Sequence, residues 1–166
     1  SQSNSFPFYF NISKDKELLF TPTINYGGGV DASQRFNFDY NQILSGGNLK
    51  TDLTIDSNFE NKNNNKWVTD ASLITIFNKN LNDKFRINFD SALETSKNYI
   101  QITKPNDDLS YTNSLSTNFN LEGFNLNKID DQLKVSLNFY QSNQEDEDNK
   151  IVPTVLPKIK YFSGYK

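Results

Sequence analysis

Hydrophobic and polar residues alternate with a period of two along nearly the whole chain, and this alternation constrains the fold more than any other feature. In residues 85–90 Phe and Ile alternate with Arg, Asn and Asp, and in residues 133–139 Leu, Val and Phe alternate with Lys, Ser and Asn. No apolar run approaches the roughly 18 residues of a membrane helix, and no long stretch has a 3.6-residue period. Because successive side chains of a strand point to opposite faces, the sequence predicts an all-β chain.

The pattern divides into nine candidate strands joined as an antiparallel meander. Several of them run for about 10 to 13 residues. Strands of globular proteins average about 5–6 residues, whereas a tilted strand that crosses a bilayer needs about 9–11. An outer-membrane barrel requires this alternation because lipid lies outside and water inside, although a soluble antiparallel sheet produces it too. We therefore expect transmembrane barrel strands at residues 6–12, 18–26, 36–40, 49–59, 67–77, 85–89, 109–121, 133–139 and 151–162.

The links between these strands alternate between short and long. The short links are 14–16, 44–48 and 79–83, the long ones are 27–32, 60–66, 94–108 and 141–150, and only 122–130 blurs the rule. This alternation matches the periplasmic turns and extracellular loops of an outer-membrane barrel. In that arrangement the first strand runs towards the periplasm.

Composition excludes several classes of function. The chain has no His and no Cys, so it has no Ser-His-Asp triad, Cys nucleophile, disulfide scaffold or zinc site of nitrogen and sulfur ligands. Its 17 basic and 20 acidic residues give a net charge of -3, so no global basic field attracts nucleic acid. Aromatic residues make up 14%, which argues against disorder. We expect no enzyme, no cofactor and no nucleic-acid partner.

Short acidic and glycine-rich motifs are better explained by loops than by ligand sites. Residues 27–29 are three glycines without the following Lys-Ser/Thr and helix of a phosphate-binding loop. Residues 145–148 could hold a divalent cation through oxygen ligands, but a solvated loop is the favoured interpretation. The pairs 107–108 and 130–131 are interpreted as turn residues.

Charged residues also occupy the polar positions within the predicted strands. Their favoured interpretation is a wet barrel wall of mixed charge, and the alternative is a path for a polar, anionic head group. These residues are Lys50, Asp52, Asp56, Asp70, Arg86, Asp90 and Lys134.

Pro7 and Pro22 fall inside the first two predicted strands, which form a hairpin. Proline has no N–H for a sheet ladder, so it belongs at edges or where pairing is weak. The two prolines predict either weakened hydrogen bonding between two strands or ordinary protection of an edge strand against pairing with another chain. The residues alone leave both possibilities open.

The segment around these prolines resembles the start of the barrel in the LptD family, the lipopolysaccharide-assembly outer-membrane proteins. Residues 7–12, Pro-Phe-Tyr-Phe-Asn-Ile, a short turn, and residues 18–22, Leu-Leu-Phe-Thr-Pro, are similar to the family pattern and keep the spacing of its outer prolines. Residues 122–124 and 151–161 are similar to segments of alphaproteobacterial members. The inner proline of the family's first turn is replaced here, with Lys14 in its place.

The resemblance implies a function, partners and a location. The function would be insertion of lipopolysaccharide into the outer leaflet of the bacterial outer membrane. The glycan would pass through the lumen, and the lipid would leave through a lateral gate weakened by Pro7 and Pro22. The partners implied are lipopolysaccharide, outer-membrane lipid, the plug lipoprotein LptE or a substitute, and the periplasmic bridge protein LptA.

The same resemblance implies that residues 1–166 are a partial barrel domain without the family's N-terminal jellyroll and remaining strands. Nine strands cannot close so wide a barrel, so an open, curved sheet with two free edges is expected. Two alternatives remain. A small outer-membrane barrel with a structural or adhesive role would pair its last strand with its first. A soluble carbohydrate-binding β-sandwich would bury its aromatic residues between two sheets.

Overall fold

The computed structural model describes residues 2–26, 33–60, 66–143 and 155–163. Over these residues the chain is almost entirely antiparallel β-sheet, as the alternation predicts. The strands are β1 (Gln2–Ser5), β2 (Phe8–Ser13), β3 (Lys16–Tyr26), β4 (Ser33–Leu44), β5 (Gly47–Glu60), β6 (Lys66–Asn80), β7 (Phe85–Glu94), β8 (Ser114–Phe124), β9 (Gln132–Ser142) and β10 (Val155–Phe162). The two short helices are α1 (Tyr99–Thr103) and η1 (Asp108–Tyr111), a 3₁₀-helix.

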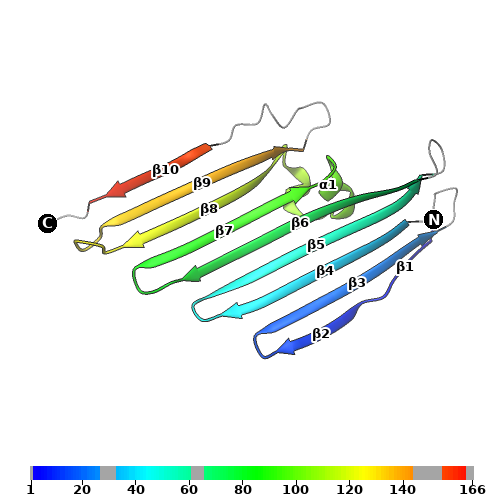
Figure 1. Cartoon of the computed structure of the whole chain (residues 1–166), viewed down its shortest axis with the longest axis horizontal. Coiled ribbons are helices and arrows are strands. Elements are labelled where there is room, and N and C mark those ends of the chain that lie inside the picture. The colour runs from blue at the N-terminus through cyan, green and yellow to red at the C-terminus, as the bar shows by residue number, and fades with distance from the viewer. Residues whose placement is uncertain (1, 27–32, 61–65, 144–154, 164–166) are drawn as a thin grey trace.

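The strands form one open sheet in chain order, in which β1 and β2 follow each other end to end along the same edge of β3 (Figure 1). Among the described strands, β1 and β2 do not pair with β10, so the sheet is not closed into a barrel. The predicted antiparallel meander and open sheet are therefore confirmed. The pairing of last with first strand that the small-barrel alternative required is not present in this part of the chain.

The strands are as long as the alternation indicated. Seven consecutive strands, β3 to β9, have 11, 12, 14, 15, 10, 11 and 11 residues. The structure has one strand more than predicted: β2 corresponds to the expected strand 6–12, and β1 precedes it, separated from it by Phe6 and Pro7.

The register gives the sheet one apolar face. Paired residues of neighbouring antiparallel strands share a face, and one such row of side chains crosses six strands. Its members are Phe8, Phe20, Phe38, Leu53, Leu73 and Leu93. The side chains of Phe8, Leu73 and Leu93 are 50%, 37% and 44% exposed, so no second layer of described residues covers this face. The aromatic residues are thus not buried between two sheets, and the sandwich alternative is wrong.

The opposite, polar face carries the only buried apolar cluster among the described residues. Ala92 on this face packs with Ile100 of α1 and with Leu115, and Ile74 and Leu109 lie against them. The connection 95–113, which we call the strap, carries α1 and η1. The predicted strand 109–121 therefore starts too early: residues 108–111 form η1, and β8 begins at Ser114.

The short hairpins lie at one end of the sheet, and the strap lies at the other (Figure 1). The β4–β5 turn is tight because Gly46 has a φ of +76°, a conformation that glycine adopts without steric cost. Gly47 follows it, and a Cβ there would overlap the backbone of Asn78. The short links of the sequence therefore lie at one end of the sheet, and the strap, which is a long link, lies at the other end.

Candidate functional site

The edge formed by β1, β2 and β3, which we call the seam edge, contains both prolines predicted to form a gate. The backbone N–H of Phe6 donates to the carbonyl of Pro22 at 3.0 Å. In an antiparallel ladder such a pair normally exchanges two hydrogen bonds. The second bond, from residue 22 to the carbonyl of Phe6, cannot form because proline has no N–H. Pro22 therefore removes one hydrogen bond between the edge strand and β3.

Pro7 acts on the other side of the edge strand. Successive backbone N–H groups of a strand point in opposite directions, so the nitrogen of Pro7 points away from β3, towards the free edge. Pro7 therefore costs no bond within this sheet and removes a donor that a strand added to the edge would use. The structure brings the two prolines close together and gives them different effects.

Aromatic side chains cover the apolar face beside the two prolines. The ring of Phe20 lies 4.7 Å from that of Phe38, 6.2 Å from that of Phe8 and 6.3 Å from that of Phe36, measured between centroids. Pro22 pairs with Phe36 in register and shares their face. The stacked rings hold the neighbouring strands together by dispersion and by burial of apolar surface, where the backbone hydrogen bonds are incomplete. The seam edge is thus weak in hydrogen bonds and rich in apolar contact.

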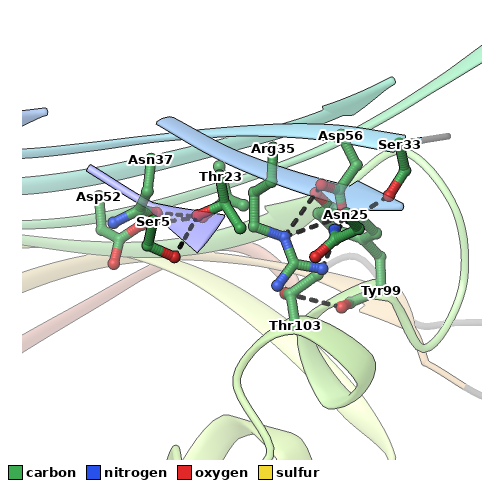
Figure 2. A network of polar contacts seen from close by, with 11 residues as sticks. Ser5, Thr23, Asn25, Ser33, Arg35, Asn37, Asp52, Asp56, Tyr99 and Thr103 are labelled. Atoms are coloured by element: carbon green, nitrogen blue, oxygen red, sulfur yellow. Dashed lines mark hydrogen bonds and ion pairs between the residues drawn. The ribbon is translucent and has the colours of Figure 1, made fainter. Parts of the chain in front are cut away.

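The charged residues predicted to line a wet wall all lie on the polar face, and several have partners there. Arg35 donates two hydrogen bonds to one carboxylate oxygen of Asp56, at 3.1 and 2.9 Å, and one to the other at 2.9 Å (Figure 2). Lys134 lies 3.4 Å from Glu122. Asp90 accepts a hydrogen bond from Asn118 at 2.7 Å. Mixed charges that neutralise each other in this way fit the favoured interpretation, a wet wall.

The strap is docked on this polar face over β4 to β7. Lys104 of the strap forms an ion pair with Asp52 of β5, beside the facing carboxylate of Asp39. Tyr99 of α1 is buried near Asp56 and Arg35, on the side of the sheet to which these side chains point (Figure 2). Burial and then the Asp56 carboxylate raise the pKa of the Tyr99 hydroxyl. Tyr99 therefore stays neutral at physiological pH.

Hydrogen bonds with three polar side chains fix the N-terminal end of the strap. The buried Glu94 carboxylate accepts the backbone N–H groups of Asn98 at 3.1 Å and Ile100 at 2.9 Å. The side-chain amide of Gln141 donates to the Glu94 carbonyl at 2.7 Å. Asn143 accepts from the backbone of Asn98 at 2.9 Å. The strap is therefore an ordered part of the polar face.

Sequence reasoning missed the strap, although a signal for it was present. Ile74, Ile76 and Ala92 lie at polar-face positions of β6 and β7 and break the alternation. The long link that follows β7 contains Tyr99 and Ile100. Apolar residues on a wet face together with an apolar loop indicate that the loop packs back onto the sheet.

The smaller motifs have mixed outcomes. Asp107 accepts the backbone N–H of Leu109 at 2.9 Å and caps η1, and the buried Asp131 accepts from the backbone of Lys128 at 2.9 Å, so both are turn residues as predicted. The glycines 27–29 and the acidic run 145–148 lie outside the described residues. Within the described ranges no His, Cys, Asp or Glu cluster is arranged to hold a metal ion. In the same ranges neither helix has the length and hydrophobicity needed to cross a membrane.

Comparison of the chain with protein families, with curated proteins and with solved structures finds no match. The resemblance to the LptD family therefore rests on the sequence motifs alone and stays a prediction.

Proposed function

We propose that this chain is a wall segment of an outer-membrane translocon that inserts lipopolysaccharide into the outer leaflet. One observation carries the proposal: a single sheet of strands up to 15 residues long exposes an apolar face on one side and a charged face on the other. Between its two edges such a sheet satisfies its backbone hydrogen bonds internally, and its faces suit lipid on one side and water on the other.

The seam edge supports the lateral-gate part of the proposal. Lipid chains must leave between two strands, and that opening is easiest where few ladder bonds need to break. Pro22 of β3 removes one hydrogen bond to the edge strand, and Pro7 removes a donor from the side of that strand that faces away from β3. The stacked rings of Phe8, Phe20 and Phe38 offer an apolar surface along which acyl chains slide.

The resemblance adds the partners to the proposal. A plug lipoprotein of the LptE kind would sit inside the barrel, and a bridge protein of the LptA kind would deliver lipopolysaccharide from the periplasm. The polar face would then line the lumen through which the glycan passes.

A pair of single-cysteine variants tests the membrane placement, because the chain has no Cys of its own. Leu73 and Ile76 lie on the same strand and are 37% and 46% exposed, but they face opposite sides of the sheet. We expect Ile76→Cys to react in intact membranes with a small water-soluble maleimide, and Leu73→Cys to react only with a lipid-soluble one. Equal labelling of both by the water-soluble reagent would refute the membrane placement.

The gate is tested by the double variant Pro7→Thr/Pro22→Val in the full-length protein. Restored N–H groups on both sides of the edge strand should tighten the seam and slow delivery of lipopolysaccharide to the cell surface. Delivery is measured by surface labelling of newly made lipopolysaccharide. The control Pro157→Val lies in β10, at the opposite edge, where the register shifts between Val155 and Lys158. Unchanged delivery in the double variant removes the gate.

A further inference from the structure

Four asparagines lie side by side on the polar face, one on each of four adjacent strands. Asn48 of β5 pairs with Asn78 of β6, Asn78 with Asn88 of β7, and Asn88 with Asn120 of β8. Ser136 of β9 continues the line. We call the four asparagines the amide row; each of them is half-buried.

The amide row has unused hydrogen-bonding capacity. None of its four side chains has a hydrogen-bond partner among the described residues. Other asparagines of the same face differ: Asn37 donates to Asp39 at 2.8 Å, and Asn118 donates to Asp90 at 2.7 Å. An amide side chain offers two donors and one acceptor oxygen. The row therefore presents a line of donors and acceptors to whatever occupies the polar side.

Charged rows flank the amide row, which is itself neutral. On the side of the short hairpins the next row contains Arg86, Glu122 and Lys134. On the strap side the next row contains Lys50 and Asp90, with Ile76 between them. A phosphate or a cation would be drawn to these flanking charges. The neutral row instead suits a ligand with hydroxyl groups and no charge.

The spacing and the free space also suit a chain of sugars. Neighbouring strands lie about 4.8 Å apart, which is close to the length of one sugar unit in an extended glycan. A hollow of about 260 Å³ opens beside the middle of the row, lined by Asn78 and Asn88 together with Gly46, Lys79, Asn80 and Arg86. Successive amides can therefore meet successive sugar rings.

We propose that the amide row binds the uncharged, hydroxyl-rich part of a glycan chain as that chain moves along the polar face. This rests on the proposed function, in which the polar face lines the channel. The row deepens that function by naming the part of the substrate it contacts. Each amide exchanges its hydrogen bonds with water for hydrogen bonds with vicinal hydroxyls, so a neutral glycan is held weakly and can slide.

Photo-crosslinking in cells tests the contact. A photoreactive residue replaces Asn88, and the control position is Asn41, on the same face, whose amide already donates to Glu17 at 3.1 Å. We expect the Asn88 probe to capture lipopolysaccharide that carries a long uncharged glycan, several-fold more than the Asn41 probe does. It should not capture lipopolysaccharide truncated to its charged inner sugars.

A third probe at Phe8 separates this inference from the proposed function. If the Phe8 probe captures lipopolysaccharide and the Asn88 probe does not, the amide row is not a glycan site, although the translocon proposal stands. If neither probe captures it, both proposals fail. Capture of a protein by the Asn88 probe would also overturn the glycan assignment.

A substitution series gives an independent measurement. Asn78→Val, Asn88→Val and Asn120→Val combined should slow surface delivery of the long-glycan form by at least about fivefold, the effect expected if only one of the three amides contributes a hydrogen bond. Delivery of the truncated form should not change. The matched triple Gln variant keeps the amides and should retain most of the rate. Wild-type delivery of the long-glycan form by a Val variant that folds, judged by heat-modifiable gel mobility, would overturn the proposal.

Discussion

The β5–β6 pair and the seam edge belong to one sheet, but their ladders differ. The β5–β6 register runs without a shift from Gly47 and Lys79 to Glu60 and Lys66. The edge strand is interrupted at Phe6 and Pro7, with the same register on both sides, and its register shifts between Asn11 and Ser13. The sheet therefore concentrates its weak pairing at one edge and keeps its centre continuous.

The strap increases this contrast, because it reinforces only the centre. Lys104 binds Asp52 in β5, and Ile100 packs on Ala92 in β7. At the seam edge the apolar contacts come from exposed rings, of which Phe8 is 50% exposed. Opening the edge thus leaves the centre intact, and this is the property that a lateral gate needs.

Proline in the centre should have the largest effect. Thr51 of β5 lies between two paired strands, so Thr51→Pro removes a ladder hydrogen bond and strains the strand. We expect a loss of about 3 kcal/mol or more in the free energy of unfolding. The measurement is the denaturant midpoint of the purified protein in detergent. A midpoint equal to that of the wild type would mean that the centre tolerates the same defect as the edge, and the contrast would disappear.

Loss of the strap anchor should have the next largest effect. Glu94→Ala leaves the backbone N–H groups of Asn98 and Ile100 without their acceptor, which costs about 2 kcal/mol. Hydrogen exchange of residues 98–104 should accelerate while exchange in β2 stays unchanged. The control Glu122→Ala breaks a partly exposed ion pair with Lys134 and should cost less than about 1 kcal/mol. Faster exchange at the seam edge in Glu94→Ala would show that centre and edge are coupled.

The strands and both faces of the sheet could be predicted from the sequence, because alternation is a local signal that each strand carries by itself. Phe85, Ile87 and Phe89 point to one side whatever their neighbours are. The order of strands followed from the short links, which permit only adjacent antiparallel pairing. The open edges were predicted from a resemblance and not from the alternation.

The strap and the separate effects of the two prolines could not be predicted in the same way. Leu109 continued the alternation of residues 115–121, so the pattern placed it in a strand, whereas in the structure it lies in η1 and packs against the apolar cluster on the polar face. Which side of its strand Pro7 weakens depends on whether the paired residues Phe6 and Pro22 exchange hydrogen bonds. That pairing is fixed by the register of two strands, and one strand's sequence does not contain it.

The smallest expected effect separates the two prolines. Replacing either proline increases the conformational entropy of the unfolded chain. This lowers the free energy of unfolding by about 0.4–1 kcal/mol. Pro22→Val also restores an N–H that points at the carbonyl of Phe6, a gain of about 1 kcal/mol, whereas the N–H restored by Pro7→Thr points away from β3. The unfolded-state contribution is common to both variants. The difference between their free energies of unfolding therefore gives the contribution of the hydrogen bond from residue 22 to the carbonyl of Phe6. We expect Pro22→Val to be the more stable by about 1 kcal/mol, with slower hydrogen exchange at Phe6 and Phe8. Equal stability and equal exchange would mean that the seam edge is held by its stacked rings alone, and that its missing hydrogen bond does not set how easily the edge opens.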